Sequence, residues 1–312
     1  MRIDFVKCHG SGNDFPLVDA RAIALSNAQW AAVARALADR AGPVGSDGLL
    51  LLTAGDAAHA FGMRMFNPDG SEAETCLNGL RCVARAGFAA TGAEAAAVKL
   101  ATSSAEVARA PDLAPGIVTI RETVGPAGLD AHWAGGADRI VESVVPGLPG
   151  GPYTALSIPN PHFIHFTHQV DEAALVAVGE ICEAAPAWLP ARANVSFVEV
   201  RGRDLFVRTF ERGVGLTNSC GSAMAASAYA ACLTGRLSFG QGFTVFNAGG
   251  LVMAEAAADG MVTLAGNATF EWEGSAEIDL AQGRAGDLRI ARHFNDEIAA
   301  WGALVDGIAT KK

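Results

Sequence analysis

Two cysteines stand at corresponding positions in two similar stretches of the sequence. Residues 64–92 and 208–235 both begin with Arg-x-Phe, continue through a Gly-containing loop and end in Thr-Gly. A cysteine follows the Phe by ten residues in each stretch, and these cysteines are Cys76 and Cys220. The shared frame of Arg, Phe, Gly and Thr-Gly indicates an internal repeat that carries one thiol in each copy.

The residues after each cysteine predict a helix, so both thiols are expected at a helix N-terminus. The unpaired N–H groups and the dipole of a first helical turn can bind a carboxylate, and the same field favours a thiolate. If two such thiols flank one amino acid, one can take the α-proton while the other delivers a proton to the opposite face. The matched pair therefore predicts general acid–base catalysis that inverts a stereocentre.

A single cysteine of this kind is more often a small buried side chain than a catalytic group. The matched positions of Cys76 and Cys220 favour the catalytic interpretation for this pair. No two cysteines form a Cys-x-x-Cys motif, so we expect free thiols and neither a disulfide framework nor a structural zinc site. The cysteines without the repeat context are interpreted as structural: Cys8, Cys82, Cys182 and Cys232.

Strand and helix patterns surround each thiol in the same order. Residues 48–66 and 194–210 each read as a β-hairpin, with apolar runs on both sides of a Gly-containing turn. The alanine-rich stretches 82–90 and 222–233 predict nearly uncharged helices that should be buried. The expected fold class is α/β (α+β) with two similar domains. Each domain would be a mixed or antiparallel sheet wrapped around a central helix, with the active site in the cleft between the domains.

A Pro- and Gly-rich segment at 125–150 predicts the boundary between the two halves. The N-terminal half is expected to comprise residues 1–125 together with a returning strand at about 270–280. The C-terminal half would comprise residues 126–269. Residues 281–312 are expected to form a C-terminal helical extension.

The composition limits the classes of partner. The chain has 312 residues, of which 50% are hydrophobic and 18% charged, and this length suits two domains. A net charge of −10 argues against nucleic acid or an anionic membrane surface as the main partner. No apolar run approaches the ~20 residues of a membrane span, and no signal-peptide pattern opens the sequence. These features predict a cytoplasmic protein.

Five motifs together resemble the diaminopimelate epimerase family over about residues 1–280. They are GSGNDF at 10–15, FNPDGSEAETCLNG at 66–79, PNPHF at 159–163, ANVSF at 193–197 and ERGVGLTNSCG at 211–221. That family interconverts LL- and meso-2,6-diaminopimelate in lysine and peptidoglycan precursor synthesis, without pyridoxal phosphate, and is usually a homodimer. The resemblance therefore implies a small-molecule amino-acid substrate, no cofactor and a homodimer.

The resemblance also implies roles for individual residues. Cys76 and Cys220 would be the two bases, and N–H groups after each cysteine would hold the carboxylate of the reacting centre. Polar side chains would hold the amino groups and the distal carboxylate. The implied substrate-binding positions are Asn13, Asn67, Leu77, Asn78, Asn160, Asn194, Glu211, Arg212, Gly221 and Ser222. His162 and Glu211 match positions beside the thiols that could tune their protonation.

Several positions depart from the family pattern, among them Ser222 and Ala223, which stand where the family normally has Thr-Gly. Leu77, Leu216 and Gly48 stand where the family normally has Gly, Glu and Gln. The residues implied to hold the distal end of the substrate are all retained, so diaminopimelate is the expected substrate.

Other functions remain open at this point. The same scaffold could support a racemase of another amino acid, such as histidine or a hydroxyproline-type substrate. A Cys-His hydrolase with Cys220 as nucleophile and His162 as base would leave Cys76 without a role. A non-catalytic binding protein would need neither thiol.

Three histidines, His162, His165 and His168, recur at every third residue of a predicted strand. Side chains alternate between the two faces of a strand, so His165 would point away from the other two. A shared metal ion is therefore not expected.

Overall fold

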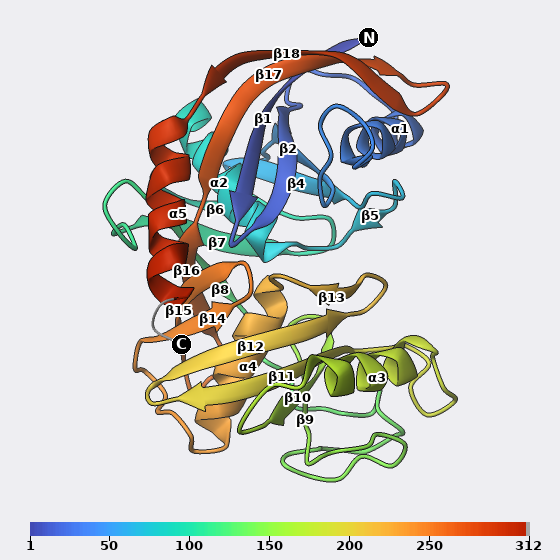
Figure 1. Cartoon of the computed structure of the whole chain (residues 1–312), viewed down its shortest axis with the longest axis vertical. Helices are drawn as coiled ribbons and strands as arrows, with labels where there is room; N and C mark the ends of the chain where they lie inside the picture. Colours follow the sequence, from blue (N-terminus) through green and yellow to red (C-terminus); the bar gives the residue numbers. More distant parts are fainter. Residues whose placement is uncertain (310–312) are drawn as a thin grey trace. The chain divides into compact units, whose positions relative to one another are not determined.

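The computed structural model describes residues 1–309, and residues 310–312 of the predicted extension lie outside the described residues. Two compact units make up the chain: unit 1 is Met1–Glu122 with Gly266–Lys312, and unit 2 is Thr123–Ala265. The chain crosses between the units within two strands, β8 (Thr119–Val124) and β16 (Val262–Asn267) (Figure 1).

The sheet of unit 1 alternates antiparallel and parallel pairs. In order, its strands are β1 (Arg2–Gly10), β2 (Asn13–Asp19), β3 (Leu49–Ala54), β4 (Phe61–Phe66), β6 (Ala95–Lys99) and β7 (Ser104–Ala110). The successive pairings are antiparallel, parallel, antiparallel, parallel and antiparallel. The short β5 (Glu72–Ala73) pairs with β4, and β17 (Thr269–Asp279) pairs with β1. The expected return of a strand near 270–280 to this unit is thus observed.

Unit 2 repeats the same scheme. Its strands are β9 (Thr154–Ser157), β10 (Pro161–Phe166), β11 (Asn194–Arg201), β12 (Asp204–Glu211), β14 (Phe243–Asn247) and β15 (Gly250–Ala256). Their pairings follow the same alternation of directions, and the short β13 (Gly215–Thr217) pairs with β12 as β5 does with β4. The repeat in the sequence is therefore a repeat in topology, and the predicted fold class is confirmed.

Helices cover both faces of the unit 1 sheet, and β3 shows why. This strand reads Leu-Leu-Leu-Leu, and none of the four side chains is more than 1% exposed. Leu49 and Leu51 share one core with Trp30 of α1 (Asn27–Ala38). Leu50 points to the other face, against α2 (Leu77–Thr91). A strand covered on both faces loses the usual alternation of apolar and polar residues.

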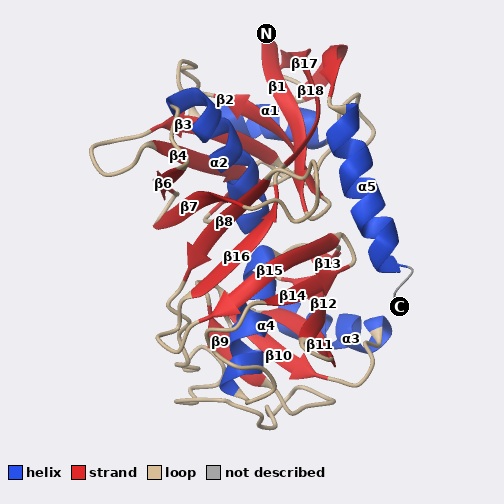
Figure 2. Ribbon diagram, turned by 90° about the vertical axis from the view of Figure 1, so that its left-hand side faces the viewer, coloured by secondary structure: helices blue, strands red, loops and turns tan. Residues whose placement is uncertain are grey.

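Unit 2 holds α4 (Gly221–Leu233) as its central helix. Every residue of this helix from Gly221 to Cys232 is buried. The helix α3 (Glu172–Glu183), which Figure 2 draws apart from α4, packs instead with Phe163 and Phe210 in a separate core. A helix that is apolar all round requires apolar neighbours on all sides. The predicted burial of α4 is therefore confirmed.

The C-terminal extension is not wholly helical, and the prediction was wrong for its first part. Residues 284–293 form β18 (Arg284–His293), which pairs antiparallel with β17. Among residues 281–309, α5 (Asn295–Ala309) is the helical part. Pairing with β17 decides this conformation, and the local sequence contains no signal of that partner. In Figure 1, β18 follows β17 along its length and α5 lies beside β17.

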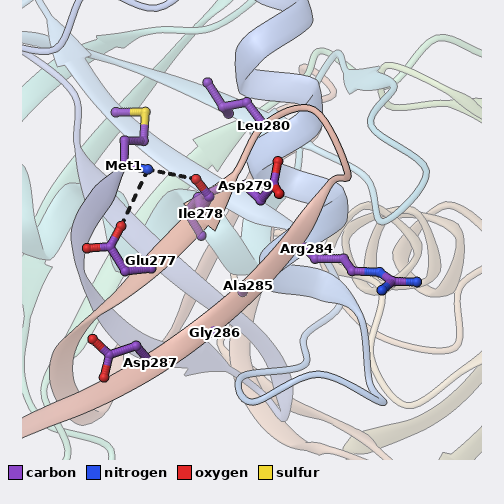
Figure 3. Close-up of a pocket in the computed structure, with 9 residues that line it drawn as sticks. All are labelled: Met1, Glu277, Ile278, Asp279, Leu280, Arg284, Ala285, Gly286 and Asp287. Carbon is purple, nitrogen blue, oxygen red and sulfur yellow. Dashed lines mark hydrogen bonds and ion pairs between the residues drawn. The ribbon is translucent and has the colours of Figure 1, made fainter.

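The N-terminus is tied to the same hairpin. The Met1 amino group donates to the carbonyl of Ile278 at 2.8 Å and lies 3.4 Å from a carboxylate oxygen of Glu277. These residues line a shallow surface hollow (Figure 3), whose lining includes none of the predicted site residues. The hollow is therefore not a candidate for the predicted active site.

Helix α2 approaches the sheet closely at Gly87. A Cβ atom at Gly87 would lie 2.5 to 2.6 Å from three ring atoms of Phe61. We predict that Gly87→Ala lowers the free energy of unfolding by about 1–3 kcal/mol, because a buried aromatic ring must move. Urea denaturation measures this change.

The matched control is Gly302→Ala in α5, where a Cβ atom would meet nothing within 4 Å. This substitution is expected to raise stability by about 0.5–1 kcal/mol through helix propensity. Equal effects of the two substitutions would contradict the close packing of α2.

Candidate active site

Cys76 is the N-cap residue of α2, as the sequence predicts. Its Sγ accepts a hydrogen bond from the backbone N–H of Gly79 at 3.4 Å. Ser, Thr, Asp and Asn are the usual residues at such a position, so helix stability alone does not account for a cysteine there. Leu77 is the first helical residue and is 4% exposed. With leucine at position 77, the backbone N–H of this residue still lies in the first turn of the helix.

A tight turn brings Asn13 to Cys76. Ser11 and Gly12, with φ of 52° and 79°, form the two-residue connection between β1 and β2. The Oδ1 atom of Asn13 accepts from the Cys76 thiol (3.8 Å) and from Asn78 Nδ2 (3.4 Å). The structure thus unites three predicted site residues, Asn13, Cys76 and Asn78.

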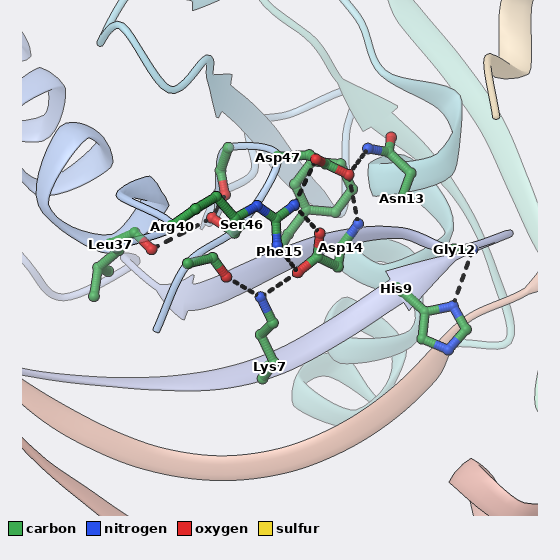
Figure 4. A network of polar contacts seen from close by, with 12 residues as sticks. Lys7, His9, Gly12, Asn13, Asp14, Phe15, Leu37, Arg40, Ser46 and Asp47 are labelled. Carbon is green, nitrogen blue, oxygen red and sulfur yellow. Dashed lines mark hydrogen bonds and ion pairs between the residues drawn. The ribbon is translucent and has the colours of Figure 1, made fainter. Parts of the chain in front are cut away.

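A charged network holds the other end of Asn13, and sequence reasoning missed it (Figure 4). Asn13 Nδ2 donates to Asp47 at 2.7 Å, and Arg40 bridges Asp47 and Asp14 with distances of 2.6 Å to each. Lys7 also contacts the Asp14 carboxylate. Although burial raises the pKa of Asp14, hydrogen bonds and charge from Arg40 and Lys7 bring it below the usual range. The only signal in the sequence was the presence of two acids in Gly-containing turns.

Asn67 is engaged within its own turn. Its Nδ2 donates to Ser71 Oγ at 3.0 Å, and its backbone N–H donates to the Ser71 carbonyl at 2.8 Å. These contacts are those of a turn-forming asparagine. The structure gives Asn67 no described contact with Cys76.

Cys220 is the N-cap residue of α4, and its environment differs from that of Cys76. The thiol is buried, with Sγ 3.5 Å from the hydroxyl of Ser222. Burial, and then the charge of Glu211, raise the pKa of Cys220 well above its usual value. The Ser222 hydroxyl and the Ala223 N–H act in the opposite direction but are outweighed. Desolvation and the charge of Glu211 thus outweigh the hydrogen-bond donors in the first turn of α4, and they favour the protonated thiol at Cys220.

Glu211 lies at the end of β12, close enough for its charge to act on Cys220. One of its carboxylate oxygens accepts from the hydroxyl of Thr217, on the adjacent β13. The effect of Glu211 on the pKa of Cys220 indicates that this carboxylate lies near the thiol. Gly221 and Ser222 open the helix immediately after the cysteine.

His162, Asn194 and Arg212 form a second polar group in unit 2. Parallel pairing of β10 and β11 sets His162 opposite Asn194, with 3.4 Å between Nε2 and Nδ2. Asn194 Oδ1 accepts from the backbone N–H of Arg212 at 2.8 Å, and the Arg212 guanidinium donates to the Ala191 carbonyl at 3.0 Å. Burial, and then the charge of Arg212, lower the pKa of His162 to about 3, so this imidazole is neutral at neutral pH.

Two buried polar atoms in this segment have no hydrogen-bond partner among the described residues. They are Oδ1 of Asn160 and Nδ1 of His162. Buried polar groups in folded proteins are nearly always paired with protein, water or ligand. These atoms are therefore suited to hold polar groups of a bound molecule.

The other departures from the family pattern have different structural settings. Gly48 has φ of 154°, and a Cβ atom there would lie 2.5 Å from the carbonyl oxygen of Phe66. The backbone at this position thus excludes any side chain. Leu216 lies on β13 and is 38% exposed.

Within the described residues, no group of three His, Cys, Asp or Glu side chains is arranged to hold a metal ion. His165, one of the three spaced histidines, contacts the Pro152 carbonyl through Nδ1 at 2.9 Å. All six cysteines are free thiols. None of the helices in residues 1–309 has both the length and the apolar character that crossing a membrane requires.

Comparison with known proteins identifies the family. The family model described as Diaminopimelate epimerase matches residues 5–110 and 154–271. The chain belongs to the diaminopimelate epimerase family. Membership confirms the resemblance drawn from the five motifs and the prediction of an isomerase that epimerises an amino acid.

Curated relatives in the diaminopimelate epimerase family match most of the chain. The enzyme of Clostridium acetobutylicum is 35% identical over 290 residues, covering 89% of this chain and 87% of its own length. The enzyme of Listeria monocytogenes is 36% identical over 293 residues, with 89% of each chain covered.

Solved structures share the fold at lower identity. A predicted epimerase from Pseudomonas aeruginosa has a TM-score of 0.64 and 20% identity, covering 87% of this chain and 98% of that chain. A hydroxyproline epimerase from Agrobacterium vitis, with bound trans-4-OH-L-proline, has a TM-score of 0.61 and 14% identity, covering 98% and 97%. At these identities the likeness concerns the fold alone.

Two buried histidines make stability depend on pH. Burial lowers the pKa of His162 to about 3 and that of His9 to about 4. In the unfolded chain both titrate near 6.5, so below that pH the unfolded state binds more protons and folding loses free energy. We predict a loss of roughly 2 kcal/mol per histidine between pH 6.5 and pH 5.

Urea denaturation at pH 7 and pH 5 measures this loss. His162→Gln and His9→Gln should each reduce the difference between the two pH values by about one histidine's share. An unchanged difference in both variants would contradict the neutral, buried state of the two imidazoles.

Proposed function

We propose that this chain interconverts LL- and meso-2,6-diaminopimelate without a cofactor, by a two-base mechanism that uses Cys76 and Cys220. One observation carries this proposal: each topologically matched unit presents a cysteine as the N-cap of a buried helix. Family membership supplies the reaction class, and the retained motifs support the substrate. The reaction would supply lysine and peptidoglycan precursors.

The first turns of the two helices would bind the carboxylate of the reacting centre. The N–H groups of Leu77 and Asn78 open α2, and those of Gly221 and Ser222 open α4. A helix N-terminus offers N–H donors and a favourable dipole to an anion. The same N–H groups would also stabilise the additional negative charge that develops on the carboxylate when the α-proton leaves.

The two thiols would act in opposite protonation states. Cys220 is protonated at neutral pH because its pKa is raised, so in one direction it would act as the acid. Cys76 would then be the thiolate base, and the Gly79 N–H can hydrogen-bond its sulfur. The base takes the α-proton, the electron pair moves onto the α-carbon and carboxylate, and Cys220 returns a proton to the opposite face. In the reverse direction the roles exchange.

The remaining polar residues would fix the rest of the substrate. Asn67 and Glu211 would hold the α-amino group, with a charge-assisted hydrogen bond from the ammonium to Glu211. Asn160, Asn194 and Arg212 would hold the distal amino-acid group. The unpaired Oδ1 of Asn160 supports this assignment. His162 would tune a thiol through its neutral ring rather than through a positive charge.

We further propose that the protein acts as a homodimer in the cytoplasm, with the amino acid as its small-molecule partner. The family resemblance supports the dimer, and the net charge of −10 supports a partner other than nucleic acid or membrane.

The first test replaces each thiol. Cys76→Ala and Cys220→Ala should each lower epimerisation by about 10²–10⁴-fold, because each removes one acid–base group. Both rates are measured by conversion of LL- to meso-diaminopimelate. Cys82→Ala and Cys232→Ala are matched controls, since these cysteines lie farther along α2 and α4 and should leave the rate nearly unchanged. Full activity in either of the first two variants would exclude the two-base mechanism.

The second test addresses the substrate. In heavy water, LL-diaminopimelate should incorporate deuterium at its α-carbon, whereas histidine and hydroxyproline should not. Leu77 beside Cys76 and the exposed Leu216 motivate this panel. Exchange confined to another amino acid would assign the protein to a racemase with a different substrate.

A further inference from the structure

Arg81 is a fully buried cation in α2, a little more than one turn after Cys76. Its guanidinium donates to a carboxylate, an amide oxygen, a backbone carbonyl and a hydroxyl: Glu122 Oε1 (2.7 Å), Asn78 Oδ1 (2.8 Å), Asn267 O (3.1 Å) and Ser11 Oγ (3.3 Å). A buried ion pair contributes little net stability compared with well-packed apolar residues. Net stability alone therefore does not explain why a buried cation lies at this position.

The surroundings leave little freedom to the Arg81 fork. Neither Arg81 nor Glu122 is exposed to solvent. On one side, a Cβ atom at Gly10 would lie 3.0 Å from Arg81 Nη2 and 2.5 Å from the Asn78 carbonyl oxygen. A lysine at position 81 could keep a charge near Glu122, but a single ammonium cannot reproduce the planar fork.

The Arg81 fork and Asp47 together fix the orientation of two amide groups, those of Asn78 and Asn13. Arg81 Nη2 donates to Asn78 Oδ1, which turns Asn78 Nδ2 toward Asn13 Oδ1 at 3.4 Å. Asp47 accepts from the other end of the Asn13 amide, its Nδ2, at 2.7 Å. Asn13 Oδ1 therefore faces the Cys76 sulfur, at 3.8 Å.

We propose that Arg81, paired with Glu122, is a positioning residue for Cys76. It orients Asn78 and, through it, Asn13, so that a carbonyl oxygen rather than an amide N–H faces the thiol. The described hydrogen bonds of the Arg81 guanidinium end on Glu122, Asn78 Oδ1, Asn267 and Ser11. The role of Cys76 as a base rests on the proposed function, whereas its hydrogen bond to Asn13 does not.

The orientation has a chemical consequence for the thiol. A carbonyl oxygen accepts from S–H and so stabilises the protonated sulfur in one rotamer. If the Asn13 amide could turn, its N–H groups would donate to the sulfur and stabilise the thiolate instead. Loss of the Arg81 fork removes one of the two restraints on the Asn13 amide, the other being Asp47, and should therefore allow Cys76 to ionise at lower pH while misaligning its proton transfer.

Arg85 supplies a matched control on the same helix. Its guanidinium holds Glu297 through two hydrogen bonds of 2.6 and 2.7 Å and donates to the Ala268 carbonyl at 2.7 Å. Like Arg81, it forms an ion pair with a carboxylate and donates to a backbone carbonyl. The carbonyl is that of Ala268 for Arg85 and that of Asn267 for Arg81. No described hydrogen bond links it to Asn78 or Asn13, so its replacement tests loss of a partly buried fork without loss of the amide orientation.

The experiment follows alkylation of Cys76 by iodoacetamide as a function of pH, in the full chain without substrate. Trypsin cuts after residue 81 in the wild type and in Arg81→Lys, so mass spectrometry reads Cys76 separately from Cys82. Arg81→Lys should shift the profile by roughly one pH unit toward lower pH. It should also lower kcat for α-hydrogen exchange about tenfold or more, with KM changed by less than about threefold. Arg85→Lys should leave the profile and kcat unchanged.

A second variant covers the case in which Arg81→Lys does not fold. Asn78→Ala removes only the amide between Arg81 and Asn13, and it should give the same shift of the alkylation profile. Where Arg81→Lys folds, the double variant should shift the profile no further than either single variant. Wild-type profiles in Asn78→Ala or in folded Arg81→Lys, or additive shifts in the double variant, would overturn the proposal.

Alkylation requires no substrate, so the two proposals fail separately. Absence of α-hydrogen exchange in the wild type, together with the expected profile shifts, would reject the proposed function and support the positioning of Cys76. Normal exchange in the wild type and unshifted profiles in the variants would reject the positioning alone.

Discussion

The unpaired N–H groups at the start of a buried helix are the constraint that organises each unit. A helix surrounded by protein cannot satisfy its first turn with bulk water, so those donors need a cap or a bound anion. In this chain the N-cap residue is Cys76 in one unit and Cys220 in the other. The alternating strand pairings and the close contact of Gly87 with Phe61 bury the helices and so create this requirement.

The two thiols occupy corresponding N-cap positions but lie in different electrostatic environments. Desolvation and Glu211 keep Cys220 protonated, whereas Cys76 lies between an N–H donor and an amide oxygen. A symmetric fold thus holds an asymmetric pair. A two-base reaction needs its two groups to differ in protonation at each step and to exchange roles when the direction reverses.

Local features of the sequence predicted much of this structure. The hairpins, the two buried helices and the cysteines at their N-termini follow from patterns within about 30 residues. Contacts between distant segments were out of reach: β18 depends on β17, and Arg81 meets Glu122 from 41 residues away. The protonation of Cys220 was also missed, because its sign depends on burial, which spacing alone does not determine.

The C-terminal segment provides contacts on which the packing of unit 1 depends. The family model ends its match at residue 271, before β18 and α5 begin. Yet α5 supplies Glu297 as the counter-ion of Arg85, and its Trp301 covers His9 with ring centres 5.5 Å apart. A chain shortened before α5 would leave the partly buried Arg85 without its carboxylate partner and would uncover His9, so the packing of unit 1 depends on a helix from the far end of the sequence.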